Sequence, residues 1–280
     1  MGFVETRVKP RYRLDRTSPL AASPPEAPDV EVALQPRLSI VIPTWNGGSR
    51  LCATLEHLQE FRNSLDFAAE IVIVDDCSEL STAKVVRDFV DQHERAVVFR
   101  NAKNRGKGHS VARGMLNAHG AYRIFVDCDL AYRSCQIIKL LHRLESGSDV
   151  VIACRVLQES RYVMSPTFFH YLYTRHLMSR AFNRLAQKLL LPGILDTQAG
   201  LKGFSAKAAE TIFSRQTLSG FGFDLECLFI ARLHGLHIEQ MPVEFHYADE
   251  PSTISFVKHG TDMLVDLLRV RQNGARGTYT

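Results

Sequence analysis

The stretch YRIFVDCDLAY, residues 122–132, joins an apolar run to two acidic residues. Ile124, Phe125 and Val126 have the branched and aromatic character of a buried strand. Asp127 and Asp129 follow immediately, at the point where such a strand ends. The stretch therefore predicts a strand whose carboxyl end carries two carboxylates.

Apolar runs of the same kind recur on both sides of this stretch. They are LSIVIP (38–43), EIVIVDD (70–76), AVVFRNA (96–102) and SDVVIACR (148–155). Patterns typical of helices lie between the runs, at 49–62, 79–93, 108–119 and 134–145. This alternation predicts an α/β fold with a mostly parallel, doubly wound sheet in a single domain. Ligands of such sheets bind beyond the carboxyl ends of the strands.

Composition limits the classes of function. The chain has 280 residues, 45% of them hydrophobic, and a net charge of +4, which is too weak to indicate nucleic-acid binding. The six cysteines form no CxxC pair, so we expect free thiols. The first residues lack the apolar core of a signal peptide, and no apolar run is long enough to cross a membrane. We expect a cytoplasmic protein whose membrane contact, if any, is peripheral, at the cytoplasmic face.

Three segments differ in character. Residues 1–36 are rich in proline and predict a flexible leader. Residues 37–250 contain the alternating strands and helices of the catalytic domain. Residues 251–280 predict a C-terminal amphipathic helix and tail.

Polar residues follow several of the predicted strands. Asp75 and Asp76 can accept hydrogen bonds from a sugar or a base, or they can cap the next helix. The loop NRGKG (104–108) has glycines that let the backbone approach a ligand, and Arg105 and Lys107 can face anionic groups; an ordinary basic turn is the alternative. Both alternatives stay open on the sequence alone.

The Asp127–Asp129 pair fits a divalent cation. Alternate residues of an extended chain point to opposite faces, so both carboxylates reach one ion only if the chain turns between them. Mg²⁺ and Mn²⁺ take carboxylate oxygens together with substrate phosphates and water. The alternative is a turn in which one aspartate acts as a cap.

Together these motifs resemble a known family. From Leu38 to about Arg271 the chain is similar to inverting family 2 glycosyltransferases of the GT-A fold. Within that family it resembles the polyprenyl-phosphate (dolichyl-phosphate) sugar transferases, with a tail like that of the dolichyl-phosphate glucosyltransferases. The matching segments are SIVIPTWN (39–46), EIVIVDDCS (70–78), NRGKGHSVARGM (104–115), FVDCDLAY (125–132), DTQAGLKGF (196–204), GFGFDLE (220–226) and STISFVKHGTDMLVDLLRVR (252–271).

The resemblance implies roles on the donor side. Residues that would bind the nucleotide sugar are Pro43, Trp45, Asn46, Asp75, Asp76, Asn104, Lys107, Gly108, Asp127 and Cys128. Asp127 and Asp129 would hold Mg²⁺ or Mn²⁺, with Asp129 as the direct ligand. Two departures affect the base and sugar contacts: Gly47 stands where the family usually has an acidic residue, and Trp45 where tyrosine is commoner.

Residues 166–191 predict a long helix that faces the acceptor. Its basic residues His176, Arg180, Arg184 and Lys188 recur every fourth position. They form either a solvated face or a surface for an anionic membrane.

The resemblance also implies an acceptor site. Arg155, Arg175 and Ser179 match the residues that bind the acceptor phosphate in the polyprenyl-phosphate branch. Guanidinium groups suit phosphate oxygens. For Arg175 the alternative is an ion pair with a nearby carboxylate.

The implied reaction is inverting transfer of a sugar from a nucleotide sugar, with UDP favoured over GDP, to a polyprenyl phosphate. The catalytic candidates are Asp129, Asp196 and Asp224. A phosphate acceptor arrives ionised, whereas a hydroxyl acceptor needs a carboxylate base, and Asp196 and Asp224 are the candidates for that base. The alternatives are the same chemistry on a small hydroxyl acceptor, and a sugar-nucleotide binding module without activity.

Overall fold

The computed structural model describes the backbone of residues 12–14, 35–129, 131–163, 169–246 and 256–280. Side chains are described for residues 35–129, 131–163, 179–246 and 261–280.

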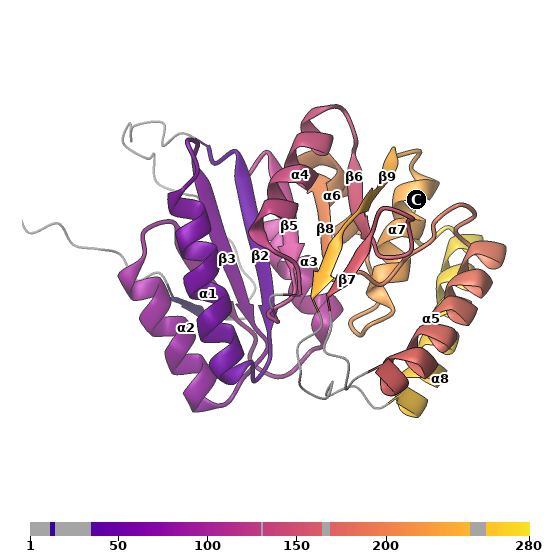
Figure 1. Cartoon of the computed structure of the whole chain (residues 1–280), viewed down its shortest axis with the longest axis horizontal. Helices are drawn as coiled ribbons and strands as arrows, with labels where there is room; N and C mark the ends of the chain where they lie inside the picture. Colours follow the sequence, from indigo (N-terminus) through magenta and orange to yellow (C-terminus); the bar gives the residue numbers. More distant parts are fainter. Residues whose placement is uncertain (1–11, 15–34, 130, 164–168, 247–255) are drawn as a thin grey trace, which may run out of the picture.

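An eight-stranded sheet forms the centre of the described molecule (Figure 1). Its strands, in spatial order, are β1 (Tyr12–Leu14), β4 (Ala96–Arg100), β3 (Ala69–Asp75), β2 (Leu38–Thr44), β5 (Tyr122–Val126), β8 (Leu201–Ser205), β6 (Val150–Cys154) and β9 (Ile238–Pro242). Neighbours run parallel except at β8, which is antiparallel to both β5 and β6. A separate parallel pair joins β7 (Arg161–Val163) to β10 (Glu244–His246). The predicted α/β class with a mostly parallel sheet is confirmed.

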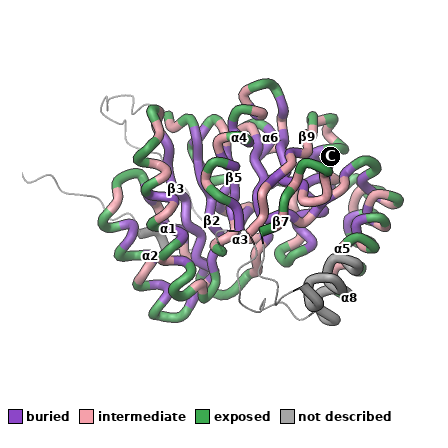
Figure 2. The backbone as a smooth tube through the Cα atoms, viewed as in Figure 1, coloured by how far each residue is buried: buried purple, intermediate pink, exposed green. Residues whose placement is uncertain are grey.

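Helices cover both faces of the sheet, because side chains alternate along each strand. Leu38, Ile40 and Ile42 of β2 belong to one core cluster, and Val41 belongs to the other. The first cluster also contains apolar residues of α1 (Gly48–Asn63), α2 (Leu80–Gln92) and α4 (Ser134–Glu145). The second contains residues of α3 (Lys107–Asn117), α6 (Ala206–Phe213) and α7 (Phe223–Leu233). Figure 2 shows the resulting buried centre between exposed helix faces.

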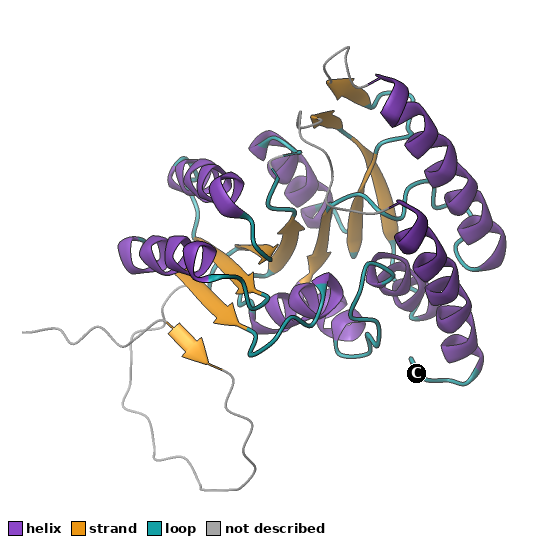
Figure 3. Ribbon diagram, turned by 90° about the horizontal axis from the view of Figure 1, so that it is seen from below, coloured by secondary structure: helices purple, strands orange, loops and turns teal. Residues whose placement is uncertain are grey.

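Two long helices lie together at one end of the molecule. They are α5 (Phe169–Leu189) and α8 (Phe256–Ala275), which contact each other and run side by side in Figures 1 and 3. Helix α8 lies within residues 251–280, the segment for which a C-terminal amphipathic helix and tail is predicted. Its described residues contribute Leu267 and Val270 to the core and leave Leu264 and Leu268 exposed.

Two features of the sheet were not predicted. β8 lies in the segment AGLKGF, whose lysine and glycine interrupt any apolar run. β1 comes from the proline-rich leader and pairs with β4 at the sheet edge. The predicted boundaries after residues 36 and 250 stay predictions, because residues 15–34 and 247–255 lie outside the described part of the chain.

Register places the strand ends at one level. Thr44 lies opposite Asp75, and Asp75 lies opposite Arg100. Val41 lies opposite Phe125, so β5 ends beside the end of β2. The loops after these four strands therefore meet along one edge of the sheet.

Candidate active site

Asp127 and Asp129 lie at this edge, directly after β5. A turn at Cys128 and Asp129 changes the chain direction between the two carboxylates. The hydroxyl of Thr54 donates to the Cys128 carbonyl at 3.0 Å, and an Asp129 oxygen accepts from the Ala131 amide at 3.1 Å. Two carboxylates one residue apart can reach the same ion only if the chain turns between them, and this turn satisfies that requirement.

Charge accumulates around the pair. Partial loss of water contact, together with the negative charge of Asp127, raises the pKa of the Asp129 carboxyl. Burial and the same two carboxylates raise the pKa of the Cys128 thiol to about 11. Two neighbouring anions that each oppose ionisation of the other favour a bound cation.

Lys107 is the cation that faces Asp127 in this structure. Its Nζ lies 2.6 Å from an Asp127 oxygen. Burial would lower the pKa of Lys107, but nearby carboxylates, chiefly Asp127 and Asp224, hold it well above its ordinary value. Two residues predicted to bind the nucleotide sugar, Lys107 and Asp127, thus lie side by side, and their binding roles stay predictions.

Glycines bring the Lys107 loop close to its neighbours. Gly106 has a φ of 96°, and a Cβ there would lie 2.4 Å from the Ser219 carbonyl oxygen. A Cβ at Gly108 would lie 2.6 Å from the Cβ of Phe223. Just before β8, a Cβ at Gly200 would overlap Asp127, at 2.0 Å from its Oδ2. Side chains at these positions would displace the loop or the carboxylate.

Asp224 is buried in the first turn of α7 and forms an ion pair with Lys202 of β8. The Lys202 ammonium also donates to the Ala199 carbonyl at 2.7 Å. Burial raises the pKa of Asp224, and the positive charges of Lys202 and Lys107 partly oppose that rise. Lys202 was not assigned from the sequence, although it lies in the motif DTQAGLKGF.

Asp75 and Asp76, which follow β3, are directed inward. Asp75 accepts from the Ser78 amide at 2.9 Å and forms an ion pair with Arg100. Asp76 accepts from the Asn101 side chain at 2.6 Å and from the amides of residues 105 and 106, each at 2.8 Å. Both residues are buried. Their oxygens order the loops that precede α2 and α3, and among the described residues neither carboxylate accepts a hydrogen bond from the first turn of α2. Their predicted nucleotide contacts stay predictions.

The motif after β2 presents one exposed ring. Trp45 is 58% exposed, while Pro43 lies within the buried end of the strand. Asn46 has a φ of 52°, and its side-chain oxygen accepts from the Glu79 amide at 2.8 Å. A Cβ at Gly47 would lie 2.9 Å from the Cβ of Leu51, so an acidic residue here requires the first turn of α1 to shift.

The remaining predicted donor residues lie on the same edge. Asn104 is exposed, Gly108 is buried at the start of α3, and Cys128 is partly buried between the two acidic residues.

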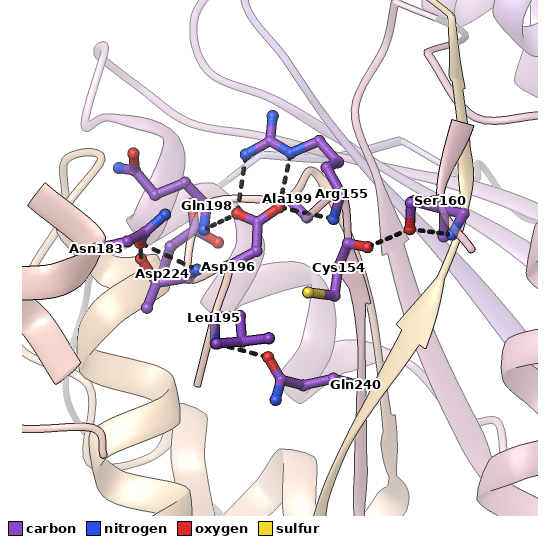
Figure 4. A network of polar contacts seen from close by, with 12 residues as sticks. Cys154, Arg155, Ser160, Asn183, Leu195, Asp196, Gln198, Ala199, Asp224 and Gln240 are labelled. Atoms are coloured by element: carbon purple, nitrogen blue, oxygen red, sulfur yellow. Dashed lines mark hydrogen bonds and ion pairs between the residues drawn. The ribbon is translucent and has the colours of Figure 1, made fainter. Parts of the chain in front are cut away.

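Arg155 and Asp196 form a tightly bonded pair beyond β6 (Figure 4). Arg155 Nε and Nη2 donate to the two Asp196 oxygens at 2.7 and 2.9 Å, and its backbone amide donates at 3.0 Å. Burial would raise the pKa of Asp196, but the Arg155 charge outweighs it and holds the pKa below its ordinary value. Asp196 also accepts from the Gln198 amide at 3.2 Å, so it orders its own loop.

The other acceptor candidates are on α5. Ser179 is partly exposed, and the Arg175 side chain lies outside the described residues. Asn183 of α5 accepts from the Thr197 hydroxyl at 2.9 Å, which ties the helix to the loop of Asp196. Of the predicted basic stripe, Arg180, Arg184 and Lys188 are exposed, and His176 has no described side chain.

A cavity of about 620 Å³ lies between α8 and the loop that precedes α7. Its lining combines apolar and charged groups, among them Phe221, Met263, Asp266 and Arg269. Helix α8 contacts the loop of Asp196 here, since the side-chain amide nitrogen of Gln198 lies 3.1 Å from the sulfur of Met263.

The acidic donor set suits a hard divalent ion. Within the part of the chain that the structure describes, no group of three or more His, Cys, Asp or Glu residues is arranged as a metal centre. Mg²⁺ and Mn²⁺ at nucleotide sites are commonly held by one or two carboxylates, with phosphates and water completing the shell. Asp127 and Asp129 therefore fit such an ion.

The fold and the family comparison together define a glycosyltransferase of the GT-A type. The family model for glycosyl transferase family 2 matches residues 39–213. The chain belongs to this family and is a glycosyltransferase.

Curated relatives agree over most of the chain. A dolichyl-phosphate beta-glucosyltransferase of Dictyostelium discoideum is 30% identical over 84% of this chain and 73% of its own length. The human dolichyl-phosphate beta-glucosyltransferase is 28% identical over 83% of this chain and 75% of its own length.

Solved structures share the fold. Mannosyl-3-phosphoglycerate synthase from Rubrobacter xylanophilus superposes with a TM-score of 0.64, at 18% identity over 87% of this chain and 76% of its own. Glucosyl-3-phosphoglycerate synthase from Mycobacterium tuberculosis, in complex with Mn²⁺, UDP and glucosyl-3-phosphoglycerate, superposes with a TM-score of 0.58, at 16% identity over 85% of this chain and 80% of its own.

In the described residues, no helix is both long and apolar enough to cross a membrane.

Proposed function

We propose that this enzyme is an inverting, metal-dependent transferase that moves glucose from UDP-glucose to a polyprenyl phosphate. The similarity to dolichyl-phosphate beta-glucosyltransferases over more than four fifths of the chain supports this donor and acceptor class. One structural observation carries the choice of acceptor: both candidate bases are paired with cations, Asp196 with the partly buried Arg155 and Asp224 with the buried Lys202.

That observation bears on the attacking group. A hydroxyl acceptor needs a carboxylate free to take its proton. The bidentate bond to Arg155 keeps Asp196 ionised but occupies both of its oxygens. Asp224 is buried and bonded to Lys202. A phosphate acceptor is already ionised near neutral pH, so a site that positions it without removing a proton is sufficient.

On the donor side, Asp127 and Asp129 would hold the divalent ion, which when bound neutralises charge on the departing diphosphate. Lys107 supplies a second positive charge at the same place, since its ammonium already lies 2.6 Å from Asp127. Gly106 and Gly108 let this loop pack against Ser219 and Phe223, which fixes the position of Lys107. Fixed charges directed at a leaving group lower the barrier without reorganisation during the reaction.

On the acceptor side, Arg155 would contact the phosphate. Its pairing with Asp196 uses Nε and Nη2 and leaves Nη1 outside the pair. The guanidinium also lies 5.4 Å from the centre of the Phe245 ring, which restricts its orientation. Arg175 and Ser179, one helical turn apart on α5, would complete this phosphate site.

We also propose peripheral contact with the cytoplasmic face of a membrane, where a polyprenyl acceptor resides. Leu264, Val265 and Leu268 of α8 are 44–59% exposed, an unusual number of large apolar side chains on one helix surface. Arg180, Arg184 and Lys188 on the neighbouring helix α5 add exposed positive charge. The described cysteines are all free, as a reducing compartment requires.

The test is a transfer assay with labelled donors. The wild-type enzyme is incubated separately with UDP-glucose, UDP-N-acetylglucosamine or GDP-mannose, with Mn²⁺ or Mg²⁺ and undecaprenyl phosphate, and then extracted into organic solvent. We expect label in the organic phase from UDP-glucose, lost on addition of EDTA. Label from another donor would correct the sugar. Transfer only to water-soluble hydroxyl compounds would overturn the acceptor.

A further inference from the structure

Glu226 of α7 is a buried carboxylate with no role in the mechanism above. It is fully inaccessible to solvent and lies two residues beyond Asp224. One of its oxygens accepts from the Thr217 amide at 3.0 Å, the Thr217 hydroxyl at 2.5 Å and the Tyr279 hydroxyl at 2.7 Å. The other accepts from the Leu218 amide at 2.8 Å. The carboxylate therefore fixes the segment that precedes α7 from within the protein.

The C-terminal end of the chain completes this network. The Asn273 side-chain amide donates to the hydroxyls of Thr217 and Tyr279, each at 3.2 Å, and both hydroxyls donate onward to Glu226. His234 bonds the Tyr279 carbonyl at 2.7 Å. Burial and the adjacent Glu226 raise the pKa of Tyr279 to about 12, so its hydroxyl remains a donor at neutral pH. The hydrogen bonds from Asn273 through the two hydroxyls all point toward the Glu226 carboxylate, an arrangement in which neighbouring bonds strengthen one another.

The opposite side of the same segment contacts the Lys107 loop. Gln216 donates to the Gly108 carbonyl at 2.9 Å, and the Ser219 carbonyl accepts from the His109 amide at 3.2 Å. Gly106 packs against Ser219 so closely that it has no room for a side chain. Any shift of residues 216–222, which we term the 216–222 loop, must therefore move the amino end of α3, where Lys107 is located.

We propose that Glu226 is a positioning residue for the nucleotide site, and that Tyr279, at the C-terminal end of the chain, is required for it to act. The carboxylate holds the 216–222 loop, the loop holds the start of α3, and α3 presents Lys107 to Asp127 and the donor diphosphate. This inference rests on the proposed function in so far as Lys107 faces a nucleotide.

Two conservative variants test the inference. Tyr279→Phe and Thr217→Val each remove one hydroxyl donor and preserve shape. We expect the Kd for UDP with Mn²⁺, measured by calorimetry well below the melting temperature, to rise about 3–10-fold, a change of the size that one typical hydrogen bond contributes. The KM for the acceptor should not change. Hydrogen exchange should become faster at residues 216–222 and 105–109.

Ser39→Ala is the matched control. Ser39 donates to the buried Glu70 at 2.6 Å, near the amino end of β2 and therefore at the edge of the sheet opposite the site. Ser39→Ala should lower the melting temperature about as much as Tyr279→Phe or Thr217→Val does, and it should leave UDP binding unchanged.

The outcomes separate the two proposals. Unchanged UDP affinity and unchanged hydrogen exchange in Tyr279→Phe and Thr217→Val would overturn the positioning role alone. An equal loss of UDP affinity in Ser39→Ala would also overturn it, because general destabilisation would then explain the effect. If the wild-type enzyme binds neither UDP nor GDP with Mn²⁺, the proposed function fails together with this role.

Discussion

Two pairs of aspartates lie at the ends of two strands that flank β2, and the two pairs differ in what they bind. Asp75 ends β3 and Asp76 follows it, whereas Asp127 and Asp129 come after β5. The first pair is buried and bonded to Arg100, Asn101 and loop amides. In the second pair, Asp127 keeps 29% of its side chain exposed and Asp129 is exposed.

The difference arises from neighbouring strands. β4 lies on the far side of β3 and places Arg100 beside Asp75, where its guanidinium neutralises that carboxylate. β5 instead has β8 beside it, and the glycine at position 200 leaves the space that Asp127 fills. Carboxylates at the same edge thus become a support for loops in one case and a ligand site in the other.

The largest effect is expected for Asp129→Asn, which tests whether the second aspartate pair is a ligand site. We expect turnover to fall by about 10³-fold or more, since the variant removes an anionic group from the charge-stabilising end of the donor site. The free energy of unfolding should stay within about 0.5 kcal/mol of wild type, because the residue is exposed and its loss relieves repulsion with Asp127. Transfer assays and urea unfolding measure the two effects. A variant that keeps a tenth of wild-type turnover would contradict the metal assignment.

Arg155→Met extends the comparison to a third strand-end carboxylate, Asp196. The pKa of Asp196 is lowered in the folded state, so its pairing contributes stability above the ordinary value of 3.8, and that contribution is lost as the pH falls through the lower folded value. Without the arginine, the buried carboxylate is unpaired at neutral pH. We expect a loss of about 3–5 kcal/mol in the free energy of unfolding at pH 7, decreasing in acid as Asp196 takes up a proton.

Urea unfolding at pH 7 and at pH 5 shows whether the loss in the free energy of unfolding becomes smaller in acid. The control is Arg155→Met combined with Asp196→Asn, which removes the unpaired charge and should recover most of the loss at pH 7. A loss of the same size at both pH values would show that packing, rather than the charge of Asp196, governs the effect.

The sequence predicted the edge of the sheet well, because local patterns determine it. The apolar runs before Pro43, Asp75 and Asp127 end where the strands end. The partners of each carboxylate could not be predicted in this way. Asp75 meets Arg100 and Asp224 meets Lys202, pairs that are 25 and 22 residues apart and come together only when the strands assemble.

Strand β8 shows that contacts between distant residues also limit how much of the fold the sequence predicts. A lysine and two glycines among residues 200–203 read as a loop. In the structure the lysine is a buried counterion for Asp224, and the glycines provide room for Asp127 and Leu140. Residues that look unsuitable for a buried strand are there because the site occupies its end.

Asp76→Asn is the smallest of the three changes and tests the comparison from the other side. Three donors converge on the Asp76 carboxylate, and an asparagine would direct its own N–H groups at one of them. We expect a loss of about 1–3 kcal/mol in the free energy of unfolding, the usual cost of leaving a buried polar group unpaired. Urea unfolding measures that loss, and UDP titration with Mn²⁺ measures binding in the same variant.

Asp129→Asn is the matched control, because it makes the same chemical change in the other pair and should give the reverse pattern. If Asp76 supports the loop, stability falls first, and UDP affinity weakens only as far as the Lys107 loop moves. If Asp76 instead contacts the nucleotide, UDP affinity falls at unchanged stability. That second result would make the two aspartate pairs alike, and the loop hydrogen bonds of Asp76 would then have to exchange when the nucleotide binds.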